Sequence, residues 1–417
     1  MNCTDGISIL KNPVRTYSWG SGTALQTLLG RPEAIGKPMA ELWMGSHPGA
    51  PSMVMKDGQW TPLGEIVRAA PESVLGKGVS KTFSRRLPFL FKVLGVGSPL
   101  SMQVHPDLRQ AGEGYARENR MGMALDAPER NYRDENHKPE IICALTPFRL
   151  LTGFREMEEI RRLMGEILPS TLFAEMPFAA GRLRSEEIRP LFDSLMTMEE
   201  HKRRALVDEA AKAARARVAE SPLFYWVSEL ASAYPGDMGV LSPLIMNFEE
   251  LKPGEAIYIP PGELHAYLDG SGIELMANSD NVLRGGLTSK HVDMRELLRV
   301  VDFSPGGAKR VLPVARGECE RAYPTPAREF LLSVISLDKR MPYTASGRRS
   351  VEILICTQGE AEVAGTGNDA PLRIGRGDAV FVPGTVLQYG IEGDATLYKA
   401  SVPILQDSKE IVARHST

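Results

Sequence analysis

Four side chains that could together bind a metal ion occur on strand-like segments far apart in the chain: Gln103, His105, Glu140 and His265. Gln103 and His105 alternate within LSMQVHP, so in an extended chain they project from the same face, about 6.5 Å apart. Glu140 leads directly into the apolar run IICAL, where an unpaired carboxylate would be costly. Two imidazoles, a carboxylate and an amide oxygen suit a borderline divalent ion, with zinc favoured and manganese, iron or cobalt left open. The absence of cysteine ligands indicates a catalytic site with an open coordination position.

Each of these residues taken alone also has a structural interpretation. An isolated histidine in an apolar strand is more often a hydrogen-bonded core residue, and Gln103 with His105 could be a polar pair on an edge strand. The spacing around His265 favours a site, because it runs Gly254, five residues, Pro260, then Gly262, His265 and Asp269. This spacing resembles the second signature of the cupin barrels, whose interior can hold a metal or a ligand.

Two lysines stand where a charge needs a partner. Lys92 interrupts the apolar run LPFLFKVLG, so its ammonium must reach solvent, form an ion pair or face a polar cavity. Lys138 precedes Glu140 by two residues and should point to the same side of an extended segment, whereas His137 alternates away. Both lysines are therefore candidates for a role beside the metal ligands.

The composition is that of an ordinary globular protein with more than one domain. The chain has 417 residues, 43% of them hydrophobic and 24% charged, and a formal charge of -3, which shows no bias toward nucleic acid or anionic membranes. Its four cysteines lack CxxC spacing, and no apolar run is long enough to cross a bilayer. We therefore expect a cytoplasmic protein, monomeric, with a small-molecule ligand and neither nucleic acid nor membrane as a partner.

The distribution of Gly, Pro and short apolar runs predicts a mainly β fold with a helical insertion. Residues 1–155 and 238–325 have the pattern of strands and turns and form the predicted catalytic domain, a cupin-type, jelly-roll β-barrel. Residues 156–237 carry helical periodicity, as in REMEEIRRLMGEIL, and form the predicted helical insert. Residues 326–417 form a predicted second cupin-like barrel without metal ligands, because Gly377 and Pro383 repeat the spacing of Gly254 and Pro260 but Gln388 replaces the histidine.

Several longer motifs resemble those of the type I phosphomannose isomerases. They are YSWG, ELWMGSHP, LPFLFKVL, LSMQVHP, NHKPE, GELHAYL and NSDNVLRGGLTSKHVD, between residues 17 and about 293. The resemblance implies a cupin-type catalytic barrel with a helical insert and a second barrel-like domain. It also implies one zinc ion per chain bound by Gln103, His105, Glu140 and His265, with Arg284 as an active-site residue.

The reaction that the resemblance implies is the reversible conversion of mannose 6-phosphate to fructose 6-phosphate. Such an aldose–ketose isomerisation moves a proton between C2 and C1 through a cis-enediol, and therefore needs a general acid/base and stabilisation of developing negative charge. The predicted catalytic residues are Arg284, Lys138, Asp280 and Lys92, with His105 a further proton carrier if the metal does not occupy it permanently. The predicted substrate-binding residues are Ser101, Lys290 and Trp19; Trp43 is expected to be a core aromatic and His47 a turn residue.

Functions of other classes remain open on the residues alone. His105, Glu140 and His265 could form the facial triad of an iron-dependent cupin oxygenase, or the barrel could bind a sugar phosphate without catalysis. A bifunctional enzyme that also makes a nucleotide sugar is disfavoured, because no glycine-rich nucleotide-binding segment is present.

Overall fold

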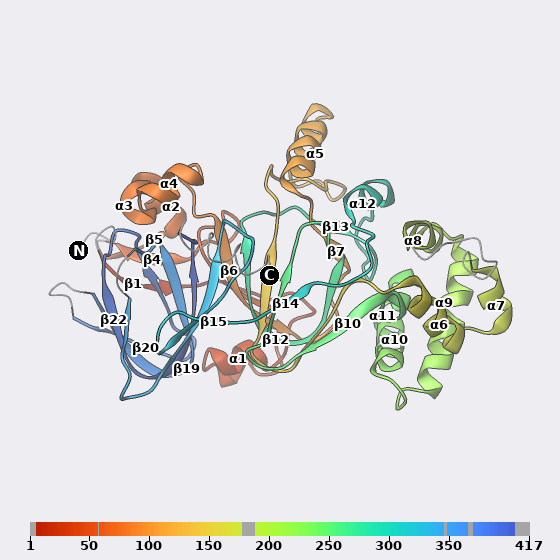
Figure 1. The fold of residues 1–417 in the computed structure, drawn as a ribbon. Coiled ribbons are helices and arrows are strands. Elements are labelled where there is room, and N and C mark those ends of the chain that lie inside the picture. Colours follow the sequence, from red (N-terminus) through yellow and green to blue (C-terminus); the bar gives the residue numbers. More distant parts are fainter. Residues whose placement is uncertain (1–5, 57, 177–187, 346–347, 366–369, 405–417) are drawn as a thin grey trace.

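Antiparallel strands dominate the fold, as the short apolar runs predict. The computed structural model describes residues 6–404 apart from 57, 177–187, 346–347 and 366–369 (Figure 1). Its strands form two 11-stranded sheets, each curved into a barrel, and the two barrels lie side by side with the helical insert beyond the central one (Figure 1). The expected mainly β fold with a helical insert is confirmed.

The central sheet carries the predicted site. Its main path is β14 (Lys309–Val311), β11 (Ala256–Ile259), β8 (Glu140–Ala144), β12 (His265–Ala277), β6 (Phe89–Val96), β3 (Glu41–Met44) and β2 (Val14–Arg15). Four more strands pair off this path: β7 (Gln103–Val104), β9 (Phe148–Phe154), β10 (Met246–Leu251) and β13 (Leu283–Arg284).

Strand β12 organises the central barrel because it pairs with β6, β7, β8 and β9 along its length. Its register places His265 opposite Gln103, Glu274 opposite Lys92 and Met276 opposite Glu140. Since side chains alternate along a strand, Ile273 and Leu275 face the other way and pack in the apolar layer shared with the second barrel.

The second sheet contains strands from both ends of the chain. Its main path is β15 (Val314–Ala315), β16 (Glu320–Tyr323), β17 (Leu331–Leu337), β22 (Tyr389–Ser401), β19 (Glu352–Gly365), β21 (Ala379–Val382), β1 (Ser8–Lys11), β4 (Met53–Lys56) and β5 (Gln59–Pro62). Strand β18 (Tyr343–Ala345) pairs with β22, and β20 (Leu372–Gly375) pairs with β19. The domain boundaries stay a prediction, but β1, β4 and β5 belong to the second sheet rather than to the central one.

The turn that repeats in the sequence also repeats in the structure. Gly254 has φ +85° and Gly377 has φ +93°, a conformation that side-chain-bearing residues rarely adopt, and each glycine precedes a short buried strand. The next strand begins at His265 in the central barrel but at Tyr389 in the second, so exposed Gln388 stands just outside it.

Helices of the predicted insert pack on one another beside the central barrel (Figure 1). They are α6 (Met157–Ile167), α7 (Ser170–Glu175), α8 (Ile188–Met196), α9 (Glu200–Ala216) and α10 (Pro222–Ala233), followed by η2 (Met238–Leu241) and α11 (Ser242–Ile245). Ser221 caps α10 as its sequence predicts, accepting a hydrogen bond from the Leu223 N–H; Ser185, another predicted cap, lies outside the described residues. Among the described helices none is long and apolar enough to cross a bilayer.

Helices also interrupt the first 155 residues, where the sequence pattern led us to expect only strands and turns. They are α1 (Ala24–Leu28), η1 (Pro32–Ala34), α2 (Leu63–Ala69), α3 (Pro71–Leu75), α4 (Lys77–Thr82) and α5 (Leu108–Arg120), and α12 (Met294–Val300) follows the site. Helix α5 begins with a capping box between Asp107 and Gln110, a start signal that the sequence carries and the strand prediction missed.

Candidate metal centre

Three of the predicted ligands converge inside the central barrel. The Nε2 atom of His105 lies 3.5 Å from Oε1 of Glu140, and Nε2 of His265 lies 3.4 Å from Oε2 of the same carboxylate. All three residues are buried, and their ligand atoms lie within 4.8 Å of one another. Gln103 is the cross-strand neighbour of His265, and its Nε2 donates to Ser101 Oγ at 3.4 Å, which leaves the amide oxygen for another partner.

Backbone carbonyls orient both imidazoles. The Nδ1 of His105 lies 2.7 Å from the carbonyl oxygen of Asn281, and the Nδ1 of His265 lies 3.1 Å from that of Glu263. A carbonyl can only accept a hydrogen bond, so each Nδ1 carries a proton, and each Nε2 faces Glu140. This arrangement, in which a ring proton is held by a backbone oxygen, is the usual one for histidines that bind metals.

The polar atoms of this cluster fit a cation. Burial, followed by the charge of Lys138, lowers the pKa of His105 well below its usual value, so its imidazole is neutral. Its buried Nε2 has no hydrogen-bond partner among the described residues. Burial acts to raise the pKa of Glu140, but Lys138 and His105 outweigh it and hold that pKa well below the usual range. A buried carboxylate beside an unpartnered imidazole nitrogen is the donor set that a divalent ion would satisfy.

The two lysines predicted to act near the ligands occupy different positions. Lys138 is nearly buried, and its Nζ lies 3.3 Å from Glu140 Oε1, directly at the cluster. Lys92 instead pairs with Glu274 at 2.9 Å and lies 3.9 Å from Glu41. Burial opposes the charge of Lys92, but Glu274 and Glu41 raise its pKa above the usual value, so it is an ammonium ion.

Two loops that carry predicted site residues are tied together by Asn281, whose side chain is buried. Its Oδ1 accepts from the N–H groups of Arg133 at 2.6 Å and Asp134 at 3.1 Å, and its Nδ2 donates to the carbonyls of Asp134 and Asn136. The Asp134 carboxylate in turn accepts from the N–H of Asp280 at 2.7 Å. The segment leading to Lys138 and Glu140 is thereby held against the segment leading to Arg284.

Comparison with known proteins decides the family. The profile described as "Phosphomannose isomerase type I, catalytic domain" matches residues 7–157. The mannose-6-phosphate isomerase of Salmonella typhimurium is 41% identical over 360 residues, covering 84% of this chain and 89% of that protein. That of Escherichia coli is 38% identical over 396 residues, covering 93% and 97%. The chain belongs to the type I phosphomannose isomerases.

Solved structures of this family have the same fold. A crystal structure of a zinc-bound mannose 6-phosphate isomerase superposes with a TM-score of 0.85 at 35% identity, covering 95% of this chain and all of that one. A Salmonella typhimurium structure, described as bound to fructose 6-phosphate and zinc, superposes with a TM-score of 0.86 at 36% identity and the same coverage.

The remaining predicted residues of the family site are placed as follows. Arg284 is half-buried on β13, where it is the cross-strand neighbour of Gln103. Lys290 is exposed beyond the Gly285-Gly286 turn, and Asp280 is half-exposed and pairs with His47 at 3.1 Å. Trp19 stacks on Tyr17 and packs against the apolar cluster that includes Leu94 and Tyr267. The roles assigned to these residues, and the metal-binding role of Gln103, stay predictions.

Sequence reasoning missed the partners of Lys92. Glu41 and Glu274 face it, and Trp43, expected to be a core aromatic, lies with its ring 5.3 Å from the Lys92 ammonium. Glu274 interrupts the apolar run GIELMA just as Lys92 interrupts LPFLFKVLG, so the same signal could have identified it. His47, expected to be a turn residue, is the nearly buried partner of Asp280.

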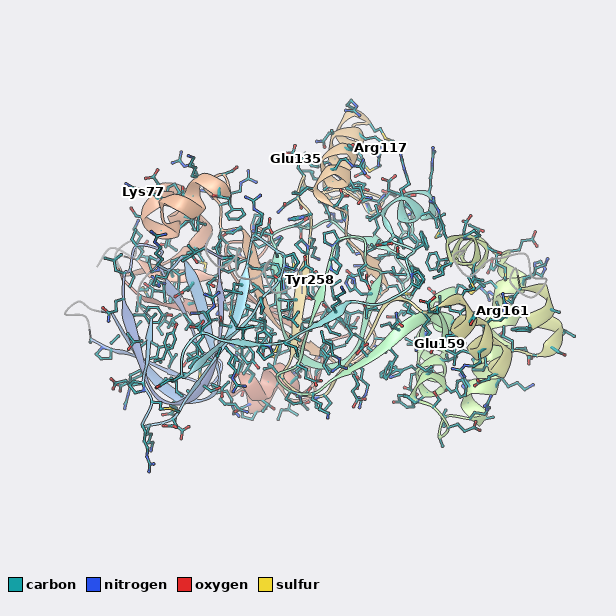
Figure 2. The ribbon with its side chains drawn as sticks, viewed as in Figure 1. Lys77, Arg117, Glu135, Glu159, Arg161 and Tyr258 are labelled. Carbon is teal, nitrogen blue, oxygen red and sulfur yellow. The ribbon has the colours of Figure 1, made fainter. Side chains whose placement is uncertain are left out.

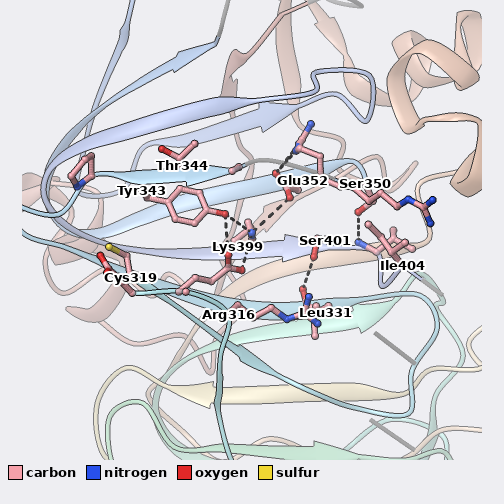
Figure 3. A pocket seen from close by; sticks show the side chains of 18 residues that line it. Arg316, Cys319, Leu331, Tyr343, Thr344, Ser350, Glu352, Lys399, Ser401 and Ile404 are labelled. Atoms are coloured by element: carbon pink, nitrogen blue, oxygen red, sulfur yellow. Dashed lines mark hydrogen bonds and ion pairs between the residues drawn. The ribbon is translucent and has the colours of Figure 1, made fainter. Parts of the chain in front are cut away.

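The second barrel also has a polar interior, but its groups satisfy one another. Lys399 lies 2.8 Å from Glu320 and 2.9 Å from Tyr343 OH (Figure 3), while Glu352 accepts from Arg349 and from Tyr389 OH. Apart from Tyr389, these residues line a cavity of about 370 Å³. Within the described residues, the cluster in the central barrel is the one group of His, Cys, Asp and Glu side chains close enough to hold a metal. That the second barrel lacks metal ligands stays a prediction.

We expect Lys399→Met to destabilise the protein by about 3–5 kcal/mol, because it leaves the buried carboxylates of Glu320 and Glu352 without their shared cation. Urea unfolding measures the change. The exposed Lys339 provides a control, since Lys339→Met should change stability by less than about 0.5 kcal/mol. If Lys399→Met cost no more than that control, or removed bound zinc, a purely structural role for the cluster would be wrong.

Proposed function

We propose that this chain performs the reaction of its family at the cluster of His105, Glu140 and His265. It is a zinc-dependent aldose–ketose isomerase that interconverts mannose 6-phosphate and fructose 6-phosphate. The observation that carries this proposal is the buried carboxylate between two carbonyl-oriented imidazoles, beside Lys138, in a chain closely related to mannose-6-phosphate isomerases.

The side chains that would hold the zinc ion are His105, Glu140 and His265, with the amide oxygen of Gln103 as the fourth ligand. A bound zinc ion supplies a Lewis acid that stabilises negative charge on the O1 and O2 atoms of the sugar. The carbonyls of Asn281 and Glu263 keep the two imidazoles in the tautomer that leaves Nε2 free for this purpose.

Proton transfer between C2 and C1 through a cis-enediol needs a group that can take up and return a proton near the ligands. We assign this role to the pair of Lys138 and Asp280. Lys138 lies at the cluster, and Asp280 precedes Asn281, whose carbonyl contacts His105. The hydrogen bond from His47 lowers the pKa of Asp280 and thereby keeps its carboxylate ionised. Lys92 suits proton abstraction less well, because Glu274 and Glu41 stabilise its charged form.

Arg284 supplies a fixed positive charge for the enediolate or the phosphate group. It is half-buried, and none of the described residues forms an ion pair or a side-chain hydrogen bond with its guanidinium. Burial lowers the pKa of Arg284 but leaves it charged, since an arginine is not deprotonated in proteins. Lys290 and Ser101 complete the proposed substrate contacts, and Trp19 is the least suited of the predicted contacts because it packs in an apolar cluster.

For its partners, we propose a sugar phosphate as the ligand and a monomeric, cytoplasmic protein that binds no nucleic acid. The near-neutral formal charge of -3 and the scattered cysteines support this part of the proposal.

The test is a coupled assay for fructose 6-phosphate formation, run with mannose 6-phosphate tritiated at C2. We expect turnover of about 1 to 10³ per second and release of tritium to water through the enediol. Binding of the sugar phosphate without tritium release would indicate a binding protein. Oxygen uptake with bound iron and no isomerisation would indicate an oxygenase, and either result would overturn the proposal.

A further inference from the structure

A positively charged residue that the sequence motifs did not single out lies on the loop tied to the Arg284 segment. Arg133 is exposed, and its backbone N–H donates to the Asn281 side chain at 2.6 Å. Asn281 stands three residues before Arg284 in the chain. The same loop carries Glu135, which Figure 2 places at the end of the central barrel where α5 stands. Figure 1 shows β7 and β13 at that end as well.

Arg133, Arg284 and Lys290 form a cluster of cations, none of which is in an ion pair with a described acidic residue. Within the part of the chain that the structure describes, none of the three side chains forms a hydrogen bond or an ion pair. Burial followed by the charge of Arg133 lowers the pKa of Arg284, and burial followed by Arg284 and Arg133 lowers that of Lys290. The three charges are therefore near enough to repel one another.

Two acidic residues lie near this cluster, but their carboxylates are hydrogen-bonded to other groups. Asp280 interacts with Arg133 through space, but its carboxylate is hydrogen-bonded to His47 at 3.1 Å. Both carboxylate oxygens of Asp134 accept hydrogen bonds within the two loops. Oδ1 accepts from the Ser279 hydroxyl and the Asn136 N–H, and Oδ2 accepts from the Asp280 N–H. An anion bound beside the three cations would reduce the repulsion among them.

We propose that Arg133 is a third cationic contact for the phosphate group of the substrate, beside Arg284 and Lys290, and that it sets the preference for phosphorylated over free sugars. A phosphate dianion offers several oxygens, and a planar guanidinium can bind two of them at once. The hydrogen bonds from the Arg133 and Asp134 N–H groups to the Asn281 side chain position Arg133, because they fix the backbone of its loop relative to β13. This inference rests on the proposed function and adds to it the residue that recognises the phosphate.

The test compares Arg133→Gln with the parent protein on three ligands. We expect the KM for mannose 6-phosphate and the inhibition constant of inorganic phosphate each to rise about tenfold, with kcat within about threefold. Activity toward unphosphorylated mannose should not change. Arg133→Lys keeps the charge and should recover part of both losses. The control is Arg109→Gln, which removes an exposed charge from α5, at the same end of the barrel, and should alter neither constant.

The outcomes separate the two levels of the proposal. If the parent protein isomerises mannose 6-phosphate but Arg133→Gln keeps both constants, Arg133 does not bind the phosphate and the inference is wrong. A fall in kcat at constant KM and constant phosphate inhibition would also overturn it, because Arg133 would then act at the reacting carbons. Absence of isomerisation in the parent protein would instead refute the proposed function.

Discussion

Removing the bound zinc with a chelator is expected to slow isomerisation at least about a hundredfold, and adding zinc back should restore the rate. Lewis-acid stabilisation of a developing oxyanion is worth several kcal/mol, and each 1.36 kcal/mol corresponds to about a factor of ten in rate. The metal-free protein should stay folded, because Lys138, His105 and His265 still surround the Glu140 carboxylate. The coupled assay, zinc analysis and circular dichroism measure the three quantities.

A substitution at the carboxylate separates loss of the metal from other effects of the chelator. Glu140→Gln removes the only formal negative charge among the predicted ligands and should weaken zinc binding at least about a hundredfold in competition with a chromophoric chelator. The matched control is Glu135→Gln on the preceding loop, where the side chain is exposed and zinc binding should not change. Full turnover in protein shown to be free of metal would rule out a role for zinc in the reaction.

Replacing Arg284 by alanine is expected to lower kcat about 10²- to 10³-fold, the usual effect of removing one charged donor that stabilises a transition state. Folding stability should change little or rise slightly, because the half-buried guanidinium has no ion-pair partner among the described residues and repels Arg133. The substitution should therefore lower kcat strongly while leaving the free energy of unfolding nearly unchanged. Steady-state kinetics and urea unfolding on the same preparations test both parts.

Two companion variants sharpen this prediction. Arg284→Lys keeps the charge but loses the planar pair of donors, so it should recover only part of the rate. Arg299→Ala removes an exposed arginine of α12 that pairs with Glu296, and should leave kcat unchanged. An unchanged kcat in Arg284→Ala would remove this residue from the mechanism, whereas a matching loss of stability would make its role structural.

Local patterns in the chain were sufficient to find the candidate ligands. Gln103 and His105 share a face because side chains alternate along an extended segment, and Glu140 drew notice as a carboxylate at the start of an apolar strand. Lys92 drew notice for the same reason, and its buried ion pair with Glu274 explains how the fold accommodates it. These signals depend on neighbouring residues only, so they can be read without knowing the fold.

The amino-acid sequence by itself determined the types of ligand, the mainly β fold and the family; the tertiary structure decided which distant groups complete the site. The backbone carbonyl of Asn281 orients His105. Every residue has a backbone carbonyl, so the sequence does not show which one contacts the histidine. The register of β12 chose Glu274 as the partner of Lys92, and β1 and β4 joined the second sheet although they begin the chain. Arg133 entered the site only because Asn281 ties its loop to that of Arg284. Strand register and loop contacts depend on burying apolar faces across the whole barrel, and a short stretch of sequence does not record them.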